Sequence, residues 1–280
     1  MRLSHNLASL NIYGEYSKVL DKQSVSYGKI SSGYKVNKSK DDPNALAKSE
    51  RLRMQIRGAQ MASRNAQDGV SMLQTVDGAL GNMSDVLIRI RELAVKAGNG
   101  TNSSEDKQII QNEINEMIKG LDDIAANTEF NDVKLIGTSE VDDNNSPIMI
   151  EMTLGNNPDE KVSIPKYDLN SSKLLGTIDV ASANSVDGAL NSIDKAIETV
   201  NSISSKYGAL QNRFESSYMN LNEISSKMES AESGLRDVDI AEEMMEFAKN
   251  NVLIEAGNAM MVQTNRFPQD FLRILENMRK

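Results

Sequence analysis

Two long apolar seams, one in each half of the chain, constrain the fold most. In each seam, apolar residues recur at alternating spacings of three and four, the period with which one face of a helix meets a partner helix. The first seam runs over residues 45–97 and the second over 186–229. They predict two long helices that pair antiparallel. The core coiled-coil residues that we expect are Leu52, Ile56, Val70, Leu73, Leu87, Ile90, Ile193, Ile197, Val200, Tyr207, Phe214 and Leu221.

The two ends of the chain, residues 1–44 and 231–280, show a weaker helical rhythm. Gly14 and Gly28 interrupt the first of them, and each costs a helix interior roughly 0.5–1 kcal/mol relative to Ala. Residues 1–40 hold seven Lys or Arg against two acids, whereas residues 231–280 hold six against nine, so the ends attract each other. Their apolar bulk is too small for a core, which indicates that they need partners from other copies of the chain. The predicted polymerisation seams contain Leu3, Leu7, Leu10, Leu20, Ile240, Met244, Val252, Ala259 and Leu275.

The middle of the chain predicts smaller elements. Gly98-Asn99-Gly100 ends the first long helix, a shorter helix is expected over 104–126, and a turn is expected over 127–131. Residues 132–185 contain three of the five prolines and short alternating apolar runs, which predict a β-hairpin followed by a Ser-rich loop. A break is expected at Ser233-Gly234. The predicted fold class is mainly α, with long antiparallel coiled-coil-like helices formed by the two chain ends and a small β-hairpin insert.

Composition excludes several functional classes. The chain has no cysteine, which removes disulfides, thiolate nucleophiles and thiolate metal sites. Its single histidine, His5, has no second metal-ligating partner of its kind, so we predict no catalytic, metal or cofactor site. A net charge of -9 argues against nucleic acid as a partner. We expect no membrane span, because no apolar run reaches the required length of about 20 residues, and no cleaved signal peptide.

Several sequence motifs in the right order resemble bacterial flagellin. The characteristic stretches are 63–69 (Ser-Arg-Asn-Ala-Gln-Asp-Gly), 89–95 (Arg-Ile-Arg-Glu-Leu-Ala-Val), 128–131 (Thr-Glu-Phe-Asn), 236–244 (Arg-Asp-Val-Asp-Ile-Ala-Glu-Glu-Met) and 262–265 (Val-Gln-Thr-Asn). Together with residues 30–42, the resemblance covers roughly 1–137 and 186–280. Only the insert is left outside it.

The resemblance implies an extracellular, non-enzymatic filament subunit for motility. It implies an inner layer made of residues 1–44 and 231–280, a surrounding core layer made of residues 45–230, and no large outer domains. It also implies export in the unfolded state by the flagellar type III apparatus without signal cleavage. The implied partners are other copies of the chain, an export chaperone that binds the C-terminal helix, the filament cap and hook-junction proteins, and a host innate immune receptor. The implied receptor contacts are Arg89, Leu93 and Glu113, and Ser171 and Ser172 are candidates for O-linked glycans.

Two other functions remain as alternatives. The first is a minor flagellin or a component of the hook–filament junction, which copy number in purified filaments would distinguish. The second is an enzyme carried on a filament, which requires catalytic residues in the insert. Residues 132–185 contain no histidine, so a zinc-protease motif is excluded there.

Overall fold

The computed structural model describes residues 6–137, 147–155, 159–181 and 186–278, without the side chains of 270–272 and 274–277. The described chain forms two compact units. One unit comprises Gln55–Ser226, and the other comprises Met1–Met54 with Lys227–Lys280. The predicted division into inner and core filament layers concerns the assembled polymer and stays a prediction.

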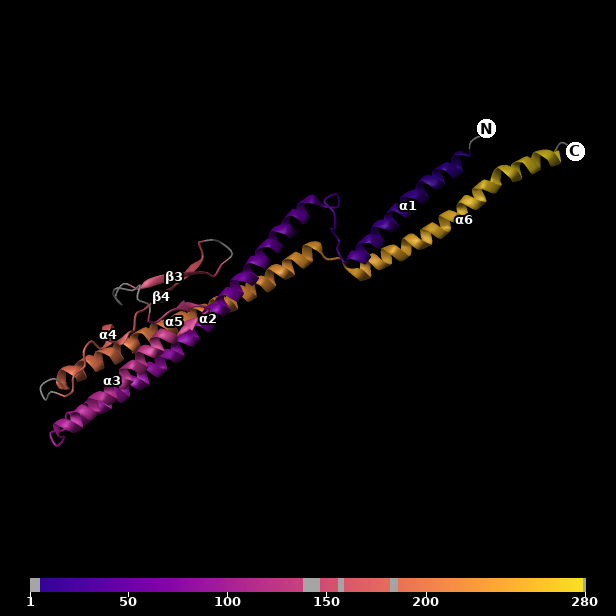
Figure 1. Ribbon diagram of the computed structural model, residues 1–280. Coiled ribbons are helices and arrows are strands. Elements are labelled where there is room, and N and C mark those ends of the chain that lie inside the picture. The colour runs from indigo at the N-terminus through magenta and orange to yellow at the C-terminus, as the bar shows by residue number, and fades with distance from the viewer. Residues whose placement is uncertain (1–5, 138–146, 156–158, 182–185, 279–280) are drawn as a thin grey trace. The chain divides into compact units, whose positions relative to one another are not determined.

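Long helices dominate the described residues, as predicted (Figure 1). In chain order they are α1 (Leu7–Ser32), α2 (Pro43–Ala97), α3 (Ser104–Asn127), the short α4 (Ser171–Leu174), α5 (Val186–Arg236) and α6 (Ile240–Met278). Asp42 caps α2, because its Oδ1 accepts hydrogen bonds from the backbone N–H groups of Asn44 and Ala45 at 3.0 and 2.9 Å. Ser103 and Asp106 form a reciprocal capping box at the start of α3.

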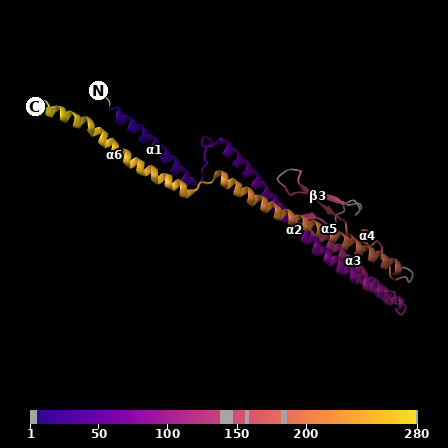
Figure 2. The ribbon, with the colours of Figure 1, turned by 180° about the vertical axis from the view of Figure 1, so that it is seen from behind.

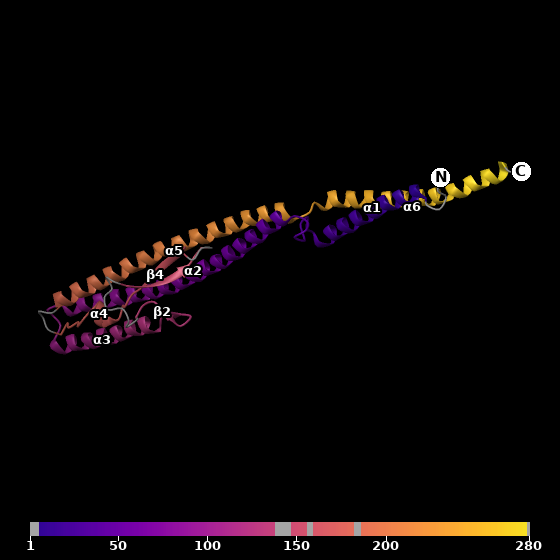
Figure 3. The ribbon, with the colours of Figure 1, turned by 90° about the horizontal axis from the view of Figure 1, so that it is seen from above.

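The unit of residues 55–226 has a continuous apolar core. Figure 3 shows α2 and α5 side by side, with α3 alongside them. Small residues let the elements approach closely. A Cβ on Gly69 would lie 2.6 Å from Cε1 of the Phe214 ring and 3.3 Å from Sδ of Met152. Among the described residues, the largest fully buried side chains all lie in this unit: Tyr207, Phe214, Leu73, Leu80, Met83, Leu87, Ile90, Ile114, Leu121, Leu135, Ile136 and Ile164.

A two-stranded antiparallel hairpin lies in this unit, where the sequence predicts one. Strand β3 (Ile148–Thr153) pairs with β4 (Lys161–Lys166), with Ile150 opposite Ile164. Strand β4 turns Val162 and Ile164 into the core. The hydroxyl of Tyr207 donates to the carbonyl oxygen of Pro165 at 2.7 Å and so ties α5 to β4.

Three local expectations differ from the structure. Residues 127–131 are not a simple turn, because β1 (Glu129–Phe130) pairs with β2 (Val133–Lys134) around Asn131 and Asp132, which both have positive φ. The Ser-rich loop contains the short helix α4. The break expected at Ser233-Gly234 lies after Arg236 instead. There, backbone hydrogen bonds to residues 33–35 hold the chain in an extended form: Lys35 N–H donates to the Arg236 carbonyl, and Val238 N–H donates to the Gly33 carbonyl.

In the other unit, α1 and α6 run side by side in opposite directions, as Figures 1 and 2 show. Helix α1 ends at Gly33, whose φ of 73° is the left-handed conformation that glycine adopts readily. Helix α6 continues through Pro268.

Candidate assembly surface on the terminal helices

The contact between α1 and α6 uses one narrow face of each helix. At the ends of the pair, Asn6 Nδ2 donates to the Thr264 carbonyl at 3.0 Å, and Lys29 Nζ lies 3.3 Å from Glu243 Oε2. Between them, the Tyr16 ring lies against Gly257, where a Cβ would be 3.1 Å from Cδ2 of the ring. These contacts run in opposite order along the two helices, which makes the pairing antiparallel.

The remaining faces of both helices carry large exposed apolar side chains. On α1, Leu7 is 71% exposed and Leu10 is 66% exposed, and Leu20 is exposed as well. On α6, Val252 is 65% exposed, and Ile240, Met244 and Ala259 are also exposed. Most of the predicted polymerisation seam therefore lies outside the contact that the two helices make within one chain. Leu3 and the side chain of Leu275 lie outside the described residues.

A cluster of polar side chains joins the first turns of α2 to the last turns of α5, next to the α5–α6 break. The guanidinium of Arg236 lies 4.8 Å from the centroid of the Tyr34 ring, and its Nη1 donates to Glu50 Oε1 at 2.8 Å. Glu232 accepts from Ser49 Oγ at 2.9 Å and pairs with Arg53 Nε at 3.2 Å. No local sequence pattern predicts this cluster, because it joins residues about 190 positions apart. The only sequence feature that pointed to this cluster was the position of Arg236 close to the predicted break.

The three predicted receptor contacts have different environments. Arg89 and Glu113 have half-exposed side chains on α2 and α3, and Arg89 Nη2 lies 3.7 Å from Glu113 Oε1. Arg89 Nη1 also donates to Glu92 at 2.8 Å. Leu93 is 2% exposed and packs in the core. The structure thus brings two of the three residues together on the surface and leaves the third below it.

The candidate glycan acceptors lie at the start of α4. Ser171 Oγ donates to Asp122 Oδ2 at 2.8 Å, and the Ser171 backbone N–H donates to Asp122 Oδ1 at 2.7 Å. Ser172 is exposed. The Ser171 hydroxyl is thus engaged in tying α4 to α3, whereas Ser172 presents its side chain to solvent.

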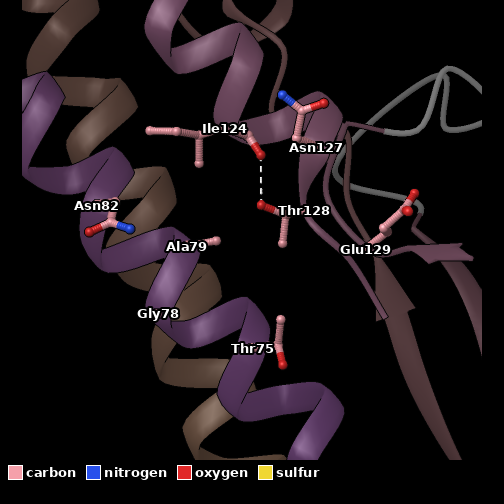
Figure 4. A pocket seen from close by; sticks show the side chains of 8 residues that line it. All are labelled: Thr75, Gly78, Ala79, Asn82, Ile124, Asn127, Thr128 and Glu129. Carbon is pink, nitrogen blue, oxygen red and sulfur yellow. Dashed lines mark hydrogen bonds between the residues drawn. The ribbon is translucent and has the colours of Figure 1, made fainter. Parts of the chain in front are cut away.

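An open pocket lies between α2 and the end of α3 in the unit of residues 55–226 (Figure 4). Its lining consists of Thr75, Gly78, Ala79, Asn82, Ile124, Asn127, Thr128 and Glu129. The Thr128 hydroxyl donates to the Ile124 carbonyl at 2.6 Å. These side chains include no imidazole or thiol that could act as a general base or nucleophile. Among the described residues, no group of three or more His, Cys, Asp or Glu is arranged to hold a metal ion.

A membrane-spanning helix is absent from the part of the chain that the structure describes. One unit of this part contains two paired helices with exposed apolar faces, and the other unit contains a well-packed core. This combination defines a structural protein whose terminal helices are built to be covered by further protein.

Comparisons with known proteins identify the family. Residues 3–140 match the model of the bacterial flagellin N-terminal helical region, and residues 190–275 match the C-terminal helical region. The chain is 38% identical to a flagellin of Bacillus subtilis, over 98% of this chain and 100% of the relative. It is 34% identical to the flagellar filament 30.7 kDa core protein of Treponema maltophilum, with the same coverage. A crystal structure of Bacillus cereus flagellin superimposes with a TM-score of 0.50 at 29% identity, over 56% of this chain and 88% of that chain.

The chain belongs to the bacterial flagellin family. As a flagellin it is a structural subunit of the extracellular flagellar filament rather than an enzyme. The family resemblance inferred from the sequence motifs is confirmed.

Proposed function

We propose that this flagellin is exported unfolded and polymerises through the apolar faces that α1 and α6 expose. The observation that carries the proposal is the exposure of Leu7 and Leu10 on α1 and of Val252 on α6, residues that a lone subunit leaves in water. Burying such side chains stabilises a contact by about 1.5–3 kcal/mol each. Several of them per subunit can therefore offset the loss of freedom on assembly.

In the filament, residues 1–44 and 231–280 would form the inner layer and residues 45–230 the surrounding core layer. The described part of the insert holds only strand β2, the β3–β4 hairpin, the short helix α4 and connecting segments. This supports a subunit without large outer domains.

Seeded polymerisation tests the proposal. Purified chain is mixed with short filament fragments and growth is viewed by negative-stain electron microscopy. A variant lacking residues 231–280 and the point variant Leu7→Asn/Leu10→Asn are expected not to elongate seeds. Asn11→Ser changes an exposed polar residue on the same helix and serves as the matched control. Filament growth by the deletion variant would overturn the proposal.

We further propose that the exposed apolar face of α6 binds an export chaperone before assembly. The same face would then be covered in turn by chaperone and by neighbouring subunits. The filament cap and hook-junction proteins would contact the ends of the polymer. Competition between chaperone and polymerisation, measured as a delay in seeded growth, tests this proposal.

Binding to a host innate immune receptor would use the half-exposed Arg89–Glu113 pair. Leu93 would contribute only by packing in the core, because it is buried. Arg89→Ala is expected to weaken receptor activation without affecting the fold, because the pair is half-exposed and contributes little to stability.

For the candidate glycan acceptors, Ser172 is the more accessible of the two. An intact mass of native protein equal to that of the bare chain would remove the glycan proposal.

A role as a minor flagellin or hook-junction component is the second candidate. It would require few copies in a purified filament, whereas a major subunit would be present throughout. Quantitative mass spectrometry of native filaments separates the two roles.

A further inference from the structure

The turn between α2 and α3 holds the one Asn-Gly pair of the sequence, Asn99-Gly100. Both residues are exposed, and the space around the Cβ position of Gly100 is open. A glycine that follows an asparagine has no Cβ to keep its backbone nitrogen away from the asparagine side chain. The pair therefore places a carboxamide next to an unhindered backbone nitrogen at a position that water reaches.

Hydrogen bonding in this turn leaves the nitrogen available and polarises the carboxamide. The Gly100 N–H donates no hydrogen bond among the described residues. The Asn99 Oδ1 atom accepts a hydrogen bond from the backbone N–H of Thr101 at 3.2 Å. When a nucleophile attacks the carboxamide carbon, negative charge develops on this oxygen, and a donor that is already in place stabilises that charge. The Gly100 nitrogen and the Asn99 carboxamide are thus prepared to react with each other.

We propose that Asn99 is a site of spontaneous deamidation. The Gly100 nitrogen gives its proton to hydroxide and bonds to Cγ of Asn99. The C–N bond of the carboxamide then breaks, and ammonia leaves with a proton from water, so that a cyclic succinimide remains. Water next opens the ring. Cleavage of the bond between the nitrogen and Cγ gives aspartate, whereas cleavage of the original peptide bond gives isoaspartate. The only co-reactant is water, and no atom is oxidised or reduced.

Asn102 lies in the same turn and shows the opposite arrangement. Its Nδ2 atom donates to the Lys96 carbonyl at 2.6 Å, so the carboxamide is held at the end of α2. The next backbone N–H, that of Ser103, donates to Asp106 Oδ2 at 3.0 Å. Both groups that would have to react are therefore engaged. The structure predicts that Asn99 reacts and that its neighbour Asn102 does not.

The reaction would change the end of α2. A carboxylate at residue 99 adds negative charge at a helix C-terminus, where the helix dipole already places a partial negative charge. Isoaspartate also lengthens the backbone by one carbon atom inside the turn that the hydrogen bond from Asn102 N–H to the Asn99 carbonyl closes at 3.2 Å. Both products should loosen this turn. The change concerns a single subunit and so goes beyond the proposed function.

Peptide mass spectrometry of the full-length chain tests the proposal. The chain is incubated in mildly alkaline buffer and sampled over time. Trypsin cuts after Lys96 and Lys107 and so releases Asn99 and Asn102 in one peptide. Fragmentation of that peptide locates the gain in mass and distinguishes aspartate from isoaspartate. Digestion in heavy-oxygen water marks any conversion that takes place during sample preparation.

In the folded chain, Asn99 is expected to react at least about tenfold faster than Asn102 and to give isoaspartate as well as aspartate. Gly100→Ala places a Cβ beside the attacking nitrogen and should slow the reaction by about tenfold. Gly120→Ala makes the same change on α3, also in open space, and should leave the rate unchanged. Circular dichroism verifies that both variants are folded.

The same incubation in urea tests the part that the fold contributes. Unfolding breaks the hydrogen bonds from Asn102 to Lys96 and from Ser103 to Asp106, so conversion of Asn102 should accelerate more than conversion of Asn99. An Asn102 rate that is the same with and without urea would contradict this protection.

Equal rates at Asn99 and Asn102 in the folded chain would overturn the proposal. So would a product that is aspartate alone, because direct hydrolysis of the carboxamide forms no succinimide. An unchanged rate in Gly100→Ala would overturn it as well. None of these readouts depends on filament growth, so failure of this inference is distinguishable from failure of the polymerisation proposal.

Discussion

The core of residues 55–226 and the pair formed by α1 and α6 are both built from long antiparallel helices, yet they differ in how much apolar surface they cover. In the core, α3 and the β3–β4 hairpin lie against α2 and α5, and side chains such as Leu73 and Phe214 are fully buried. In the α1–α6 pair, no third element of this chain covers the outer faces among the described residues. Leu10 and Val252 consequently stay exposed.

The difference shows that two helices alone bury only a narrow stripe. A helix with apolar residues on more than one face needs a second layer, and the core supplies that layer from within the chain. For the terminal helices, we infer that neighbouring subunits supply it. The same helical periodicity thus predicts a folded core in one region and an interface in the other.

Two side-chain truncations test the difference between the closed core and the open α1–α6 pair. Phe214→Ala removes a fully buried ring and should lower the free energy of unfolding by about 3–5 kcal/mol. Leu10→Ala removes a side chain that is already 66% exposed and should change it by less than about 0.5 kcal/mol. Urea unfolding followed by circular dichroism measures both. Equal losses would contradict the distinction between a closed core and an open pair.

The buried Tyr207 hydroxyl offers a second measurement. Burial raises the pKa of this phenol, so the group stays a neutral donor to the Pro165 carbonyl throughout the ordinary pH range. Tyr207→Phe leaves that buried carbonyl without its partner and should cost about 1–3 kcal/mol. Urea midpoints of the two proteins provide the value. A stable variant with an unchanged midpoint would mean that water or a shifted backbone replaces the hydroxyl.

Gly69 tests how tightly α2 and α5 are packed. A Cβ at this position would lie 2.6 Å from the Phe214 ring, so the ring must move. Overpacking of this kind costs about 1–3 kcal/mol, and the higher helix propensity of Ala offsets about 1 kcal/mol of it. Gly69→Ala should therefore destabilise modestly. Gly208→Ala, on α5 with open space around it, is the control and should not destabilise.

The smallest effect is expected at the capping box of α3. The Ser103 hydroxyl and backbone N–H donate to Asp106 and hold the pKa of that carboxyl below its ordinary value of 3.8. A carboxyl with a lowered pKa in the folded state stabilises above its unfolded pKa, and this contribution is lost as pH falls through the folded value. The first turn of α3 should thus fray below about pH 4. Amide hydrogen exchange at Asp106 and Lys107 detects it, and Ser103→Ala should already show the loss at neutral pH.

The helices, the hairpin and the family can be inferred from local sequence patterns alone. The spacing of apolar residues and the preferences of turn residues are local properties of the sequence. They predict the start of α2 at Pro43, after the Asp42 cap, and the two strands that contain Ile150 and Ile164. The motifs at 63–69 and 236–244 were sufficient to identify a flagellin, because long matches in order are specific.

Which faces of the terminal helices meet depends on contacts between distant segments of the chain. Helix α1 carries apolar residues all around, so its periodicity does not tell whether Leu10 or Tyr16 faces α6. The close approach of Tyr16 to Gly257 selects the face, and these two residues are about 240 positions apart in sequence. The contacts of Arg236 have the same origin, and so does the end of α5 at Arg236 instead of at the expected Ser233-Gly234 break. They rest on hydrogen bonds and ring contacts between distant segments, which no local pattern encodes.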